Sequence, residues 1–380
     1  MPCARDSVAP VLQEHSGWIA VAAVVLVVLL ALAVAGWAGM RGPTSGGAHR
    51  RRRWGRRPHR NDFRPEGTVT ETATRRVAVI VNPTKFDDLE AVQRRITQQA
   101  VQLGWAEPLF IETTEKDPGT GQAKEALAQG VDLICPLGGD GTVRCVGAAL
   151  VGTDTPMGLL PGGTGNLLAR NLDLPFDDLH DALHIALTGQ NKRVDVGRLT
   201  VDASGEDQRP QEHIFLVMAG LGFDAAIMAD APERLKAKVG PAAYVVSGAR
   251  NLRGAQFKVR VKIDDQEEFS RRARTVVVGN CGKLLGGLVL MPEAEVDDGL
   301  IDTVILSPAG IVGWAAVAAR IASKRRKGHS RVDHHTSKTV KVRSDRPQEV
   351  QVDGDTIGKA RAIAAEVVPA SLVVRVGSVE

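Results

Sequence analysis

Gly138-Gly139-Asp140-Gly141-Thr142 marks the point where a short apolar run, Val131 to Pro136, gives way to a helix-compatible run from Val143. A strand, a glycine turn and a helix start form a geometry that binds phosphate. Glycines let backbone N–H groups approach an oxyanion, and a helix N-terminus adds partial positive charge. Because Asp140 would repel phosphates unless a cation or a hydrogen-bond donor intervenes, the stretch predicts a nucleotide site that works with Mg²⁺.

Strand and helix patterns alternate on both sides of this turn. Runs suited to buried strands are Val77–Val81, Pro108–Ile111, Val131–Pro136 and Met157–Leu160. Helical patterns are 89–103, Gly121–Gln129, Val143–Val151 and Leu167–Leu172. This alternation predicts an α/β domain over residues 76–193, with a Rossmann-like parallel sheet, helices on both faces and ligands at the carboxyl edge of the sheet.

A second glycine cluster, Pro161-Gly162-Gly163-Thr164-Gly165-Asn166, follows the last of these strands directly. One such cluster alone is explained as well by a tight turn. Two of them on neighbouring strands favour a pair of turns that close on one phosphate chain. Neither is a Walker A loop, because GxxxxGK[ST] does not occur in the chain.

Beyond residue 193 the pattern changes to strands in succession, some of which alternate apolar and polar residues, as Lys258 to Ile263 do. Candidate strands include Val194–Leu199, Ile214–Met218, Phe257–Ile263, Thr275–Gly279, Leu300–Leu306, Thr339–Val342, Val350–Val352 and Leu372–Val376. An antiparallel β-sandwich over residues 194–380 is therefore predicted, with the active site in the cleft between the two domains. The basic stretch that contains His334 and His335 is expected to be a solvated loop.

The N-terminal region predicts a membrane anchor. Residues 17–40 carry no charge and place Trp18 and Trp37 near their ends, which suits one transmembrane helix after a short extracytoplasmic tail, 1–16. A cleaved signal peptide is the alternative, but Arg5 is outnumbered by Asp6 and Glu14. Eight arginines between positions 41 and 60 follow the span, so the positive-inside rule places the catalytic domains on the cytoplasmic side of a cell membrane.

Charge and cysteine content narrow the function classes. The formal net charge is +4, but the basic linker, 41–75, holds the eight arginines, and the rest of the chain is net negative. A nucleic-acid partner is therefore not indicated. The linker is either a topology signal only or also a binding site for anionic phospholipid headgroups. The four cysteines show no paired spacing for a disulfide framework or a zinc site.

Four motifs in order carry a resemblance. The motifs are Gly138–Thr142, Pro161–Asn166, the segment 280–302 with Asp297-Asp298-Gly299, and Val352-Asp353-Gly354-Asp355. With these motifs the chain resembles the diacylglycerol kinase catalytic family, in its bacterial lipid kinase branch, which is related to sphingosine kinases and distantly to NAD kinases. The resemblance covers about residues 76 to 376 and implies a two-domain fold, ATP as phosphoryl donor, Mg²⁺ and a lipid hydroxyl as acceptor.

The resemblance also implies roles for individual residues. The cofactor-binding residues it implies are Asn82, Thr113, Gly138, Gly139, Asp140, Gly141, Thr142, Gly163 and Thr164. Asp298 would ligate Mg²⁺, with the backbone carbonyls of Glu295 and Leu300. Taken by themselves, Asp297 and Asp298 are explained equally well as turn formers.

Asp355 falls where the family usually has a glutamate that acts as general base. An aspartate carries the same carboxylate on a stem shorter by one CH₂, so its reach is the open point. Without the other motifs, an ordinary Asp-Gly hairpin acid would explain this residue. A base that accepts the hydroxyl proton is expected to contribute about 10²- to 10⁴-fold to the rate.

The sequence thus predicts a membrane-anchored lipid kinase that uses ATP and Mg²⁺ and phosphorylates diacylglycerol or a similar membrane lipid. The alternatives are a catalytically silent nucleotide-binding membrane protein and an NAD kinase-like enzyme. The partners expected are the lipid substrate and anionic headgroups, with no nucleic acid; a homodimer is left open.

Overall fold

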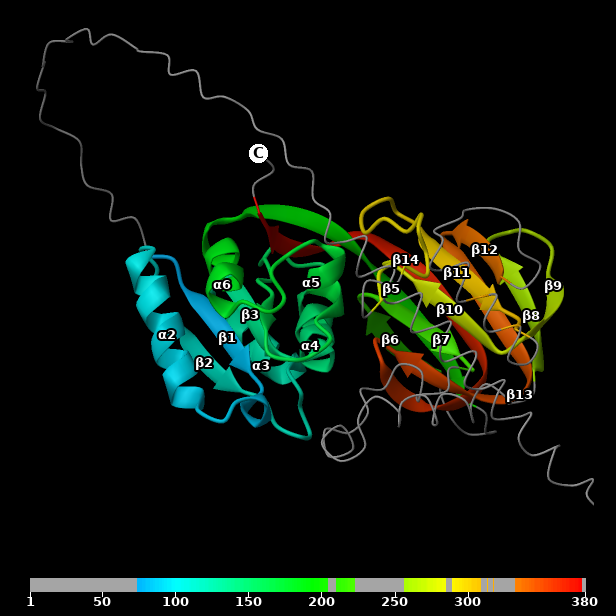
Figure 1. Cartoon of the computed structure of the whole chain (residues 1–380), viewed down its shortest axis with the longest axis horizontal. Coiled ribbons are helices and arrows are strands. Elements are labelled where there is room, and N and C mark those ends of the chain that lie inside the picture. Colours follow the sequence, from blue (N-terminus) through cyan, green and yellow to red (C-terminus); the bar gives the residue numbers. More distant parts are fainter. Residues whose placement is uncertain are drawn as a thin grey trace, which may run out of the picture.

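The structure is a computed structural model, which describes residues 74–203, 210–222, 256–284, 289–308, 313, 317 and 332–377. It comprises an α/β domain followed by a larger β domain, which lie side by side in Figure 1. The predicted transmembrane helix, 17–40, lies outside the described residues. Within those residues, no helix combines the length and the apolar character needed to cross a membrane.

The first domain is built on a parallel sheet with the strand order β2-β1-β3-β4. Its strands are β1 (Val77–Val81), β2 (Leu109–Glu112), β3 (Leu133–Gly138) and β4 (Leu160–Pro161). Its helices are the 3-10 turn η1 (Pro83–Lys85), α2 (Leu89–Gln102), α3 (Thr120–Ala128), α4 (Asp140–Leu150), α5 (Leu167–Asn171) and α6 (Leu179–Thr188). The predicted parallel α/β domain is confirmed.

The apolar strands form the centre of this domain because both faces of the sheet are covered. Every residue of β1 and β3 is buried. One face packs on α2 and α6 through residues such as Ile96 and Leu183, and the other contacts α3 and α4 through Ala126 and Val146. Continuous apolar strands with amphipathic helices on both sides are what a parallel sheet requires.

The second domain is antiparallel, as predicted. Its strands are β5 (Gln190–Ala203), β6 (Gln211–Phe215), β7 (Met218–Leu221), β8 (Phe257–Ile263), β9 (Phe269–Ala273), β10 (Thr275–Gly279), β11 (Ile301–Leu306), β12 (Val332–Ser337), β13 (Thr339–Val352) and β14 (Asp355–Val376). They pair in the order β12-β11-β10-β7-β13-β14-β5-β6, with β8 and β9 branching from β13. Buried side chains from several of these strands form one core that includes Phe215, Val259 and Val350.

Two long strands join the domains. β5 leads out of α6, and the end of β14 returns to the first domain, where Met157 donates its N–H to Val373 O at 2.8 Å and Arg375 N donates to Met157 O at 2.9 Å (Figure 1). A continuous apolar cluster runs through both domains and contains Ile134, Val196 and Val374. The two domains therefore share part of their core, which fixes the strand ends of one against the loops of the other.

Three details of the second domain differ from the prediction. The run Ile214–Met218 is not one strand but the end of β6 and the start of β7, because the N–H groups of residues 216 to 218 donate to a carboxylate instead of a neighbouring strand. Strand β9 was not predicted. His334 and His335 lie on the half-buried strand β12 rather than in a solvated loop.

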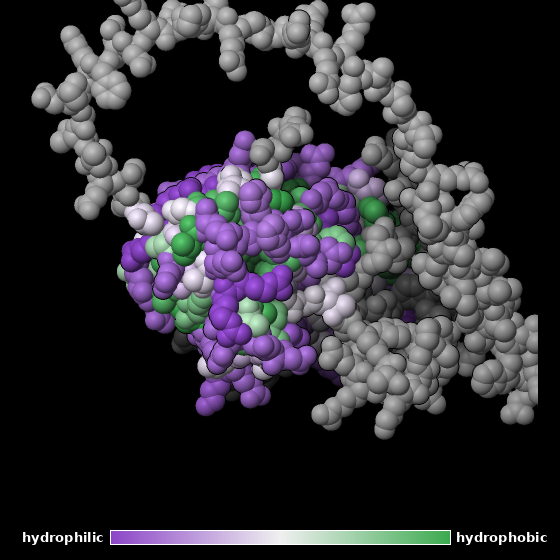
Figure 2. All heavy atoms as spheres, turned by 60° about the vertical axis from the view of Figure 1, so that its left-hand side comes forward, coloured by the Kyte–Doolittle hydropathy of each residue, from purple (hydrophilic) through white to green (hydrophobic). Residues whose placement is uncertain are grey.

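The surface of the first domain is mainly hydrophilic where Figure 2 shows it. Among the described residues, Val101 is the one large apolar side chain recorded as exposed, at 51%. No broad apolar face is therefore left on the described parts of the molecule to be covered by a partner.

Candidate active site

The first glycine turn lies at the carboxyl end of the parallel sheet. β3 ends at Gly138, Gly139 is the N-cap of α4, and the helix begins at Asp140. No side chain caps this helix through a hydrogen bond at the N-cap position. Because the first N–H groups of a helix have no partner within it, the start of α4 offers donors to an anion.

The second glycine turn packs directly on the first. Gly162 N donates to Gly138 O at 3.2 Å. A Cβ added at Gly162 would lie 2.7 Å from Gly138 N, and one added at Gly163 would lie 2.8 Å from Gly139 Cα. Such distances exclude any side chain, so the two turns need glycine for mutual backbone contact. The predicted pairing of the two turns is present in the structure.

Asp140 connects the turns. Its Oδ1 accepts a hydrogen bond from Leu167 N at 2.7 Å, at the start of α5. Burial raises the pKa of the Asp140 carboxyl, while hydrogen bonds from Leu167 and Asn166 act in the opposite direction. The hydrogen-bond donor that an acid beside phosphates requires is thus supplied by the second turn itself. Asp140 supports the geometry of the site through this contact.

The other predicted nucleotide-binding residues gather at the same edge. Asn82 follows β1 and donates its N–H to Leu137 O at 3.0 Å, while its Oδ1 accepts from Thr84 N and Thr84 Oγ1. Thr113 follows β2, is 7% exposed and donates its N–H to Val81 O. Within the glycine turns, Thr142 is buried and Thr164 is exposed. Three strand ends and both turns therefore share one surface.

Lys85 belongs to this edge although the sequence analysis did not single it out. It ends η1, is exposed, and its Cε lies 4.0 Å from the position of a Cβ added at Gly139. A lysine beside a phosphate-binding turn supplies a positive charge that the turn lacks. In the sequence, Lys85 differs from other lysines only by its position three residues after Asn82, and this position does not indicate a site residue unless the fold is known.

The candidate base, Asp355, comes from the other domain and reaches the first glycine turn. Its Oδ2 lies 3.1 Å from the position of a Cβ added at Gly141. Arg144, in the second turn of α4, donates from Nη2 to the same oxygen at 2.5 Å. The structure thus brings Asp355 and the first glycine turn together across the domain boundary, although they are far apart in sequence.

A buried acid holds the turn that carries Asp355. Asp353 is 5% exposed and accepts three backbone hydrogen bonds at 2.9 Å, from the N–H groups of Leu216, Val217 and Met218. It adopts φ +47 in the turn between β13 and β14. Burial raises the pKa of Asp353 to about 6 despite those three donors. Asp353 was quoted within a motif, but its anchoring role was not predicted.

The predicted metal residues lie on the loop before β11. Asp298 Oδ1 accepts from Leu300 N at 2.9 Å, which is the hydrogen bond of an Asx turn. Burial raises the pKa of Asp298, and the nearby charges of Asp302, Asp195 and Glu295 raise it further. Excess negative charge of this kind is relieved by a bound cation.

Asp195, on β5, orders this loop and was missed by the sequence analysis. It is 2% exposed, accepts from Gly299 N through Oδ2 and from Ala370 N through Oδ1, both at 2.6 Å. Asn280 Nδ2 donates to the Asp195 carbonyl at 2.7 Å, while Asn280 Oδ1 is buried and finds no partner in the described part of the chain. Asp195 therefore holds the loop from β5, through Gly299 N and through its own N–H, which donates to Val296 O at 2.7 Å.

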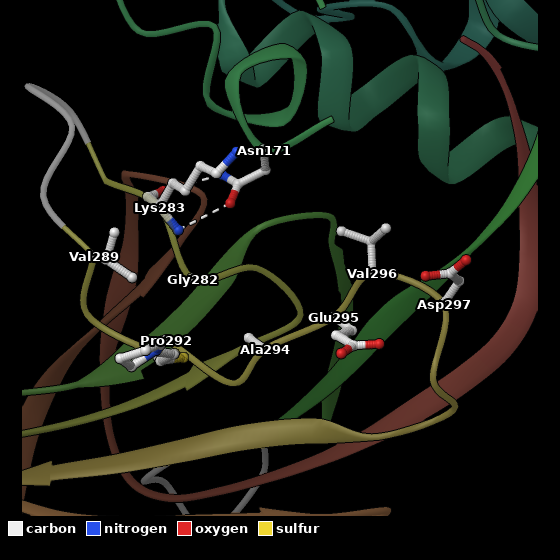
Figure 3. A pocket seen from close by; sticks show the side chains of 10 residues that line it. Asn171, Gly282, Lys283, Val289, Pro292, Ala294, Glu295, Val296 and Asp297 are labelled. Atoms are coloured by element: carbon white, nitrogen blue, oxygen red, sulfur yellow. Dashed lines mark hydrogen bonds between the residues drawn. The ribbon is translucent and has the colours of Figure 1, made fainter. Parts of the chain in front are cut away.

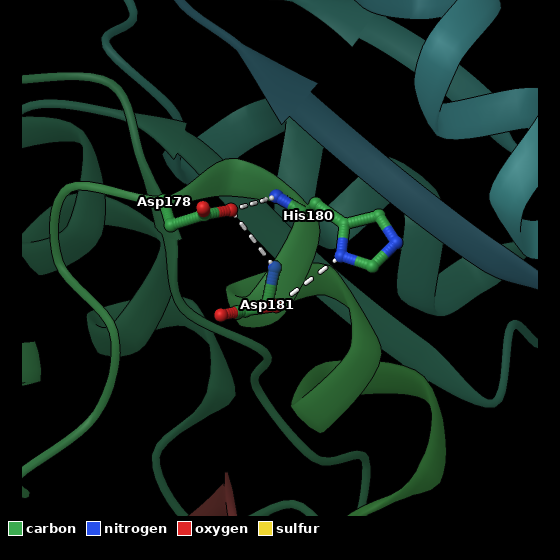
Figure 4. Close-up of side chains that lie close together, drawn as sticks. All are labelled: Asp178, His180 and Asp181. Carbon is green, nitrogen blue, oxygen red and sulfur yellow. Dashed lines mark hydrogen bonds and ion pairs between the residues drawn. The ribbon is translucent and has the colours of Figure 1, made fainter.

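The loop that carries Glu295, Asp298 and Leu300, called the metal loop below, suits magnesium through one side-chain oxygen ligand together with backbone carbonyls. Its predicted side-chain ligand is a single carboxylate, that of Asp298. Mg²⁺ prefers oxygen ligands and keeps several waters, so one carboxylate with backbone carbonyls is a suitable donor set. Among the described residues, three side-chain ligand atoms converge only at Asp178, His180 and Asp181 (Figure 4). That group is exposed, and Asp178 Oδ1 already accepts from two N–H groups at the start of α6.

A cavity of about 620 Å³ opens between α5, the helix that follows the second glycine turn, and the metal loop. Asn171 of α5 lines it from one side, where its side chain exchanges two hydrogen bonds with the backbone of Lys283 (Figure 3). Glu295, Val296 and Asp297 line it from the other side. The cavity thus lies between residues of both domains.

Comparison with known proteins identifies both parts of this arrangement. Residues 76–199 match the model described as diacylglycerol kinase catalytic domain, and residues 217–376 match that of the YegS C-terminal NAD kinase beta sandwich-like domain. Residues 76–199 therefore form a diacylglycerol kinase catalytic domain. The chain is a lipid kinase.

Relatives of this lipid kinase cover most of its length. A diacylglycerol kinase of Staphylococcus saprophyticus is 28% identical over 292 residues, which is 75% of this chain and 90% of the relative. One of Staphylococcus aureus strain JH9 is 26% identical over 294 residues, 76% and 88% of the two chains. A crystal structure of a diacylglycerol kinase from Bacillus anthracis has a TM-score of 0.62 and 25% identity, and covers 80% of this chain and 98% of that one.

Proposed function

We propose that this lipid kinase transfers the γ-phosphoryl group of ATP, with Mg²⁺, to the hydroxyl of diacylglycerol or a similar membrane lipid. The observation that carries the proposal is the convergence of two interlocked glycine turns with Asp355 of the other domain. The relatives named diacylglycerol kinase support the class of lipid. Phosphoryl transfer depends mainly on alignment and charge neutralisation, which such a constellation supplies.

The residues would divide the work as follows. The N–H groups at the start of α4 and the turn around Gly163 and Thr164 bind the phosphates, with Lys85 as a nearby positive charge. Asn82 and Thr113 border the nucleotide. Mg²⁺ supplies positive charge that offsets the phosphate charge; the loop of Glu295, Asp298 and Leu300 is the proposed metal-binding segment. This set of roles extends over both domains.

Asp355 is the proposed general base. The lipid O–H bond breaks and its proton passes to the Asp355 carboxylate, while the lipid oxygen forms a bond to the γ-phosphorus. The bond between that phosphorus and the bridging oxygen breaks, and its electron pair leaves with ADP. In this scheme the shorter aspartate serves because its carboxylate already lies beside the first turn of α4.

The proposal includes the membrane. Residues 17–40 would anchor the enzyme in the cell membrane with both catalytic domains on the cytoplasmic side, and the arginines of the linker 41–75 would bind anionic headgroups. Tethering raises the effective concentration of a substrate that stays in the bilayer. Sedimentation of the full chain with vesicles, with and without phosphatidylserine, tests whether the linker binds anionic headgroups. Light scattering tests the homodimer that the sequence analysis left open.

The decisive experiment uses purified protein, labelled ATP, Mg²⁺ and mixed micelles of candidate lipids. Label in diacylglycerol or a related lipid alcohol supports the proposal. ATP binding without label in any lipid supports a silent nucleotide-binding protein, and label in NAD supports an NAD kinase-like enzyme.

Substitution of the base sharpens the test. Asp355→Asn is expected to lower kcat by about 10²- to 10⁴-fold while ATP affinity is kept, because the amide cannot accept the proton. The control is Asp345→Asn, an exposed acid on β13, which should leave kcat unchanged. A loss of less than tenfold for Asp355→Asn would remove Asp355 as the base.

A further inference from the structure

The ion pair between Arg144 and Asp355 joins two elements that are separated by 211 positions in the chain. Arg144 lies on α4, one turn beyond the phosphate-binding glycines, and Asp355 begins β14 in the other domain. Neither the glycine motif nor the acid motif predicts this contact. It is the direct side-chain link between the phosphate-binding turn and the proposed base.

The two partners differ in how firmly they are held. The Arg144 side chain is 17% exposed, whereas the Asp355 side chain is 56% exposed. Arg144 Nε is buried and has no hydrogen-bond partner among the residues that the structure describes, so the guanidinium stem is enclosed and its Nη2 points to Asp355. The arginine is therefore the fixed partner, and the carboxylate is the group whose position the contact decides.

The contact leaves one carboxylate oxygen for chemistry. Arg144 donates to Oδ2 of Asp355, the oxygen that lies over Gly141. Among the described residues, the recorded hydrogen bond and ion pair of the Asp355 carboxylate both go to Oδ2, which leaves Oδ1 outside that contact. A charge-assisted hydrogen bond to one oxygen fixes the side-chain rotamer and leaves the other oxygen as the proton acceptor.

We propose that Arg144 positions the Asp355 carboxylate beside the phosphate-binding turn and thereby enables an aspartate to act where the resemblance leads us to expect the longer glutamate. The inference rests on the proposed function. Without Arg144, a solvent-exposed carboxylate would populate several rotamers, only some of which face the first turn of α4. Arg144 acts through Asp355 in this role and is a positioning residue.

The test combines kinetics with a double-mutant cycle on the full chain, in mixed micelles of diacylglycerol. The variants are Arg144→Gln, Arg144→Lys, Asp355→Asn and the double variant Arg144→Gln/Asp355→Asn. Arg94→Gln is the matched control, because Arg94 is exposed and pairs with Glu90 on its own helix. The ATP affinity of each variant is measured by equilibrium binding.

Arg144→Gln is expected to lower kcat by about 10- to 100-fold with ATP affinity changed less than about threefold, which is the range for a misplaced catalytic group. Arg144→Lys should recover part of that loss, since it restores the charge. In the Asp355→Asn background, Arg144→Gln should lower kcat by less than about threefold, because the group that it positions is already absent. Arg94→Gln should match the wild type.

Two kinetic outcomes would overturn the inference. Equal losses for Arg144→Gln in both backgrounds would show that Arg144 acts independently of Asp355. A higher kcat for Arg144→Gln would show that the ion pair restrains the base. Wild-type protein that binds ATP but labels no lipid would contradict the proposed function instead.

The Tm of each variant in the double-mutant cycle is also measured by thermal unfolding, which does not depend on catalytic turnover. A shift in Tm of about 1 to 3 °C that appears for Arg144→Gln alone and not in the Asp355→Asn background supports the pairing. Additive shifts in Tm would overturn it even where the lipid assay gives no label.

Discussion

Glycines in the two turns serve different purposes. A Cβ at Gly162 would meet the backbone of Gly138, so this glycine is required for the contact between the turns. A Cβ at Gly139 would meet only Lys85 Cε, at 4.0 Å, so this position is open in the protein itself. Gly139 therefore leaves space on the side from which a phosphate approaches in the proposed function.

Substitution of each glycine by alanine separates these purposes. Gly162→Ala is expected to lower Tm by about 2 to 10 °C, because overpacking costs about 1–3 kcal/mol. Gly139→Ala should leave Tm within about 2 °C and raise the KM for ATP roughly tenfold, since its methyl group would occupy the phosphate side. Differential scanning calorimetry and steady-state kinetics measure the two effects. A large loss of stability for Gly139→Ala would contradict this assignment.

Lys85 supplies a second prediction for single residues. Lys85→Ala is expected to raise the KM for ATP roughly tenfold with little change in Tm, because a hydrogen bond to a charged group contributes about 1.5–3 kcal/mol. The control is Lys124→Ala, an exposed lysine on α3. Equal KM values for the two variants would show that Lys85 does not contact the nucleotide.

The turn between β13 and β14 is the element that positions the candidate base. Three successive N–H groups, two between β6 and β7 and one at the start of β7, donate to Asp353, and this is why the two strands separate there. The same carboxylate fixes the turn that presents Asp355. The Asp353 carboxylate thus both interrupts the predicted strand Ile214–Met218 and fixes the position of Asp355.

Asp353 also makes stability depend on pH. The folded state binds its proton more tightly than the unfolded chain, since burial raises the pKa to about 6. Its contribution to stability is therefore full below about pH 4 and is lost as pH rises through about 6. The expected loss is at most about 3 kcal/mol in the free energy of unfolding.

Asp353→Asn should flatten this dependence, because an amide does not titrate. Urea unfolding at several pH values between 4 and 7 measures the slope in each protein. Asp345→Asn, which changes an exposed acid on the same strand, should keep the wild-type slope. Parallel curves for wild type and Asp353→Asn would rule out Asp353 as the source.

At the scale of the whole molecule, the end of β14 completes the first domain. Gly152 N donates to Ser371 O at 2.7 Å, and Leu372 and Val374 are fully buried. The first domain is therefore stabilised by the last strand of the other domain. A change at one end of β14 is expected to reach the phosphate-binding edge through this shared core.

Truncation tests the dependence. A chain that stops after Ala370 loses Leu372 and Val374 from the core, which is expected to cost about 3 to 6 kcal/mol and to weaken ATP binding. A chain that stops after Gly377 keeps all of β14 and should behave as the full protein does. Thermal unfolding and ATP titration compare the two. Unchanged ATP affinity in the shorter chain would show that the first domain is independent.

The local sequence determined most of the elements of the first domain and the class of chemistry. The alternation of apolar runs and helical patterns indicated the parallel sheet, and the two glycine clusters indicated its phosphate-binding edge, because short-range spacing and turn chemistry suffice for both. The motifs also led to Asp355, although its reach stayed open. Sequence patterns of this kind depend on neighbours within a few residues.

Tertiary structure alone decided how these elements meet. The contacts of Asp355 with Arg144, of Asp353 with the start of β7, and of β14 with Met157 join positions far apart in the chain. Such contacts depend on strand register and on the packing of a shared core, and local spacing does not encode them. The reach of the shorter Asp355 side chain is therefore a property of the folded protein, in which Arg144 and Asp353 hold it beside the glycine turn.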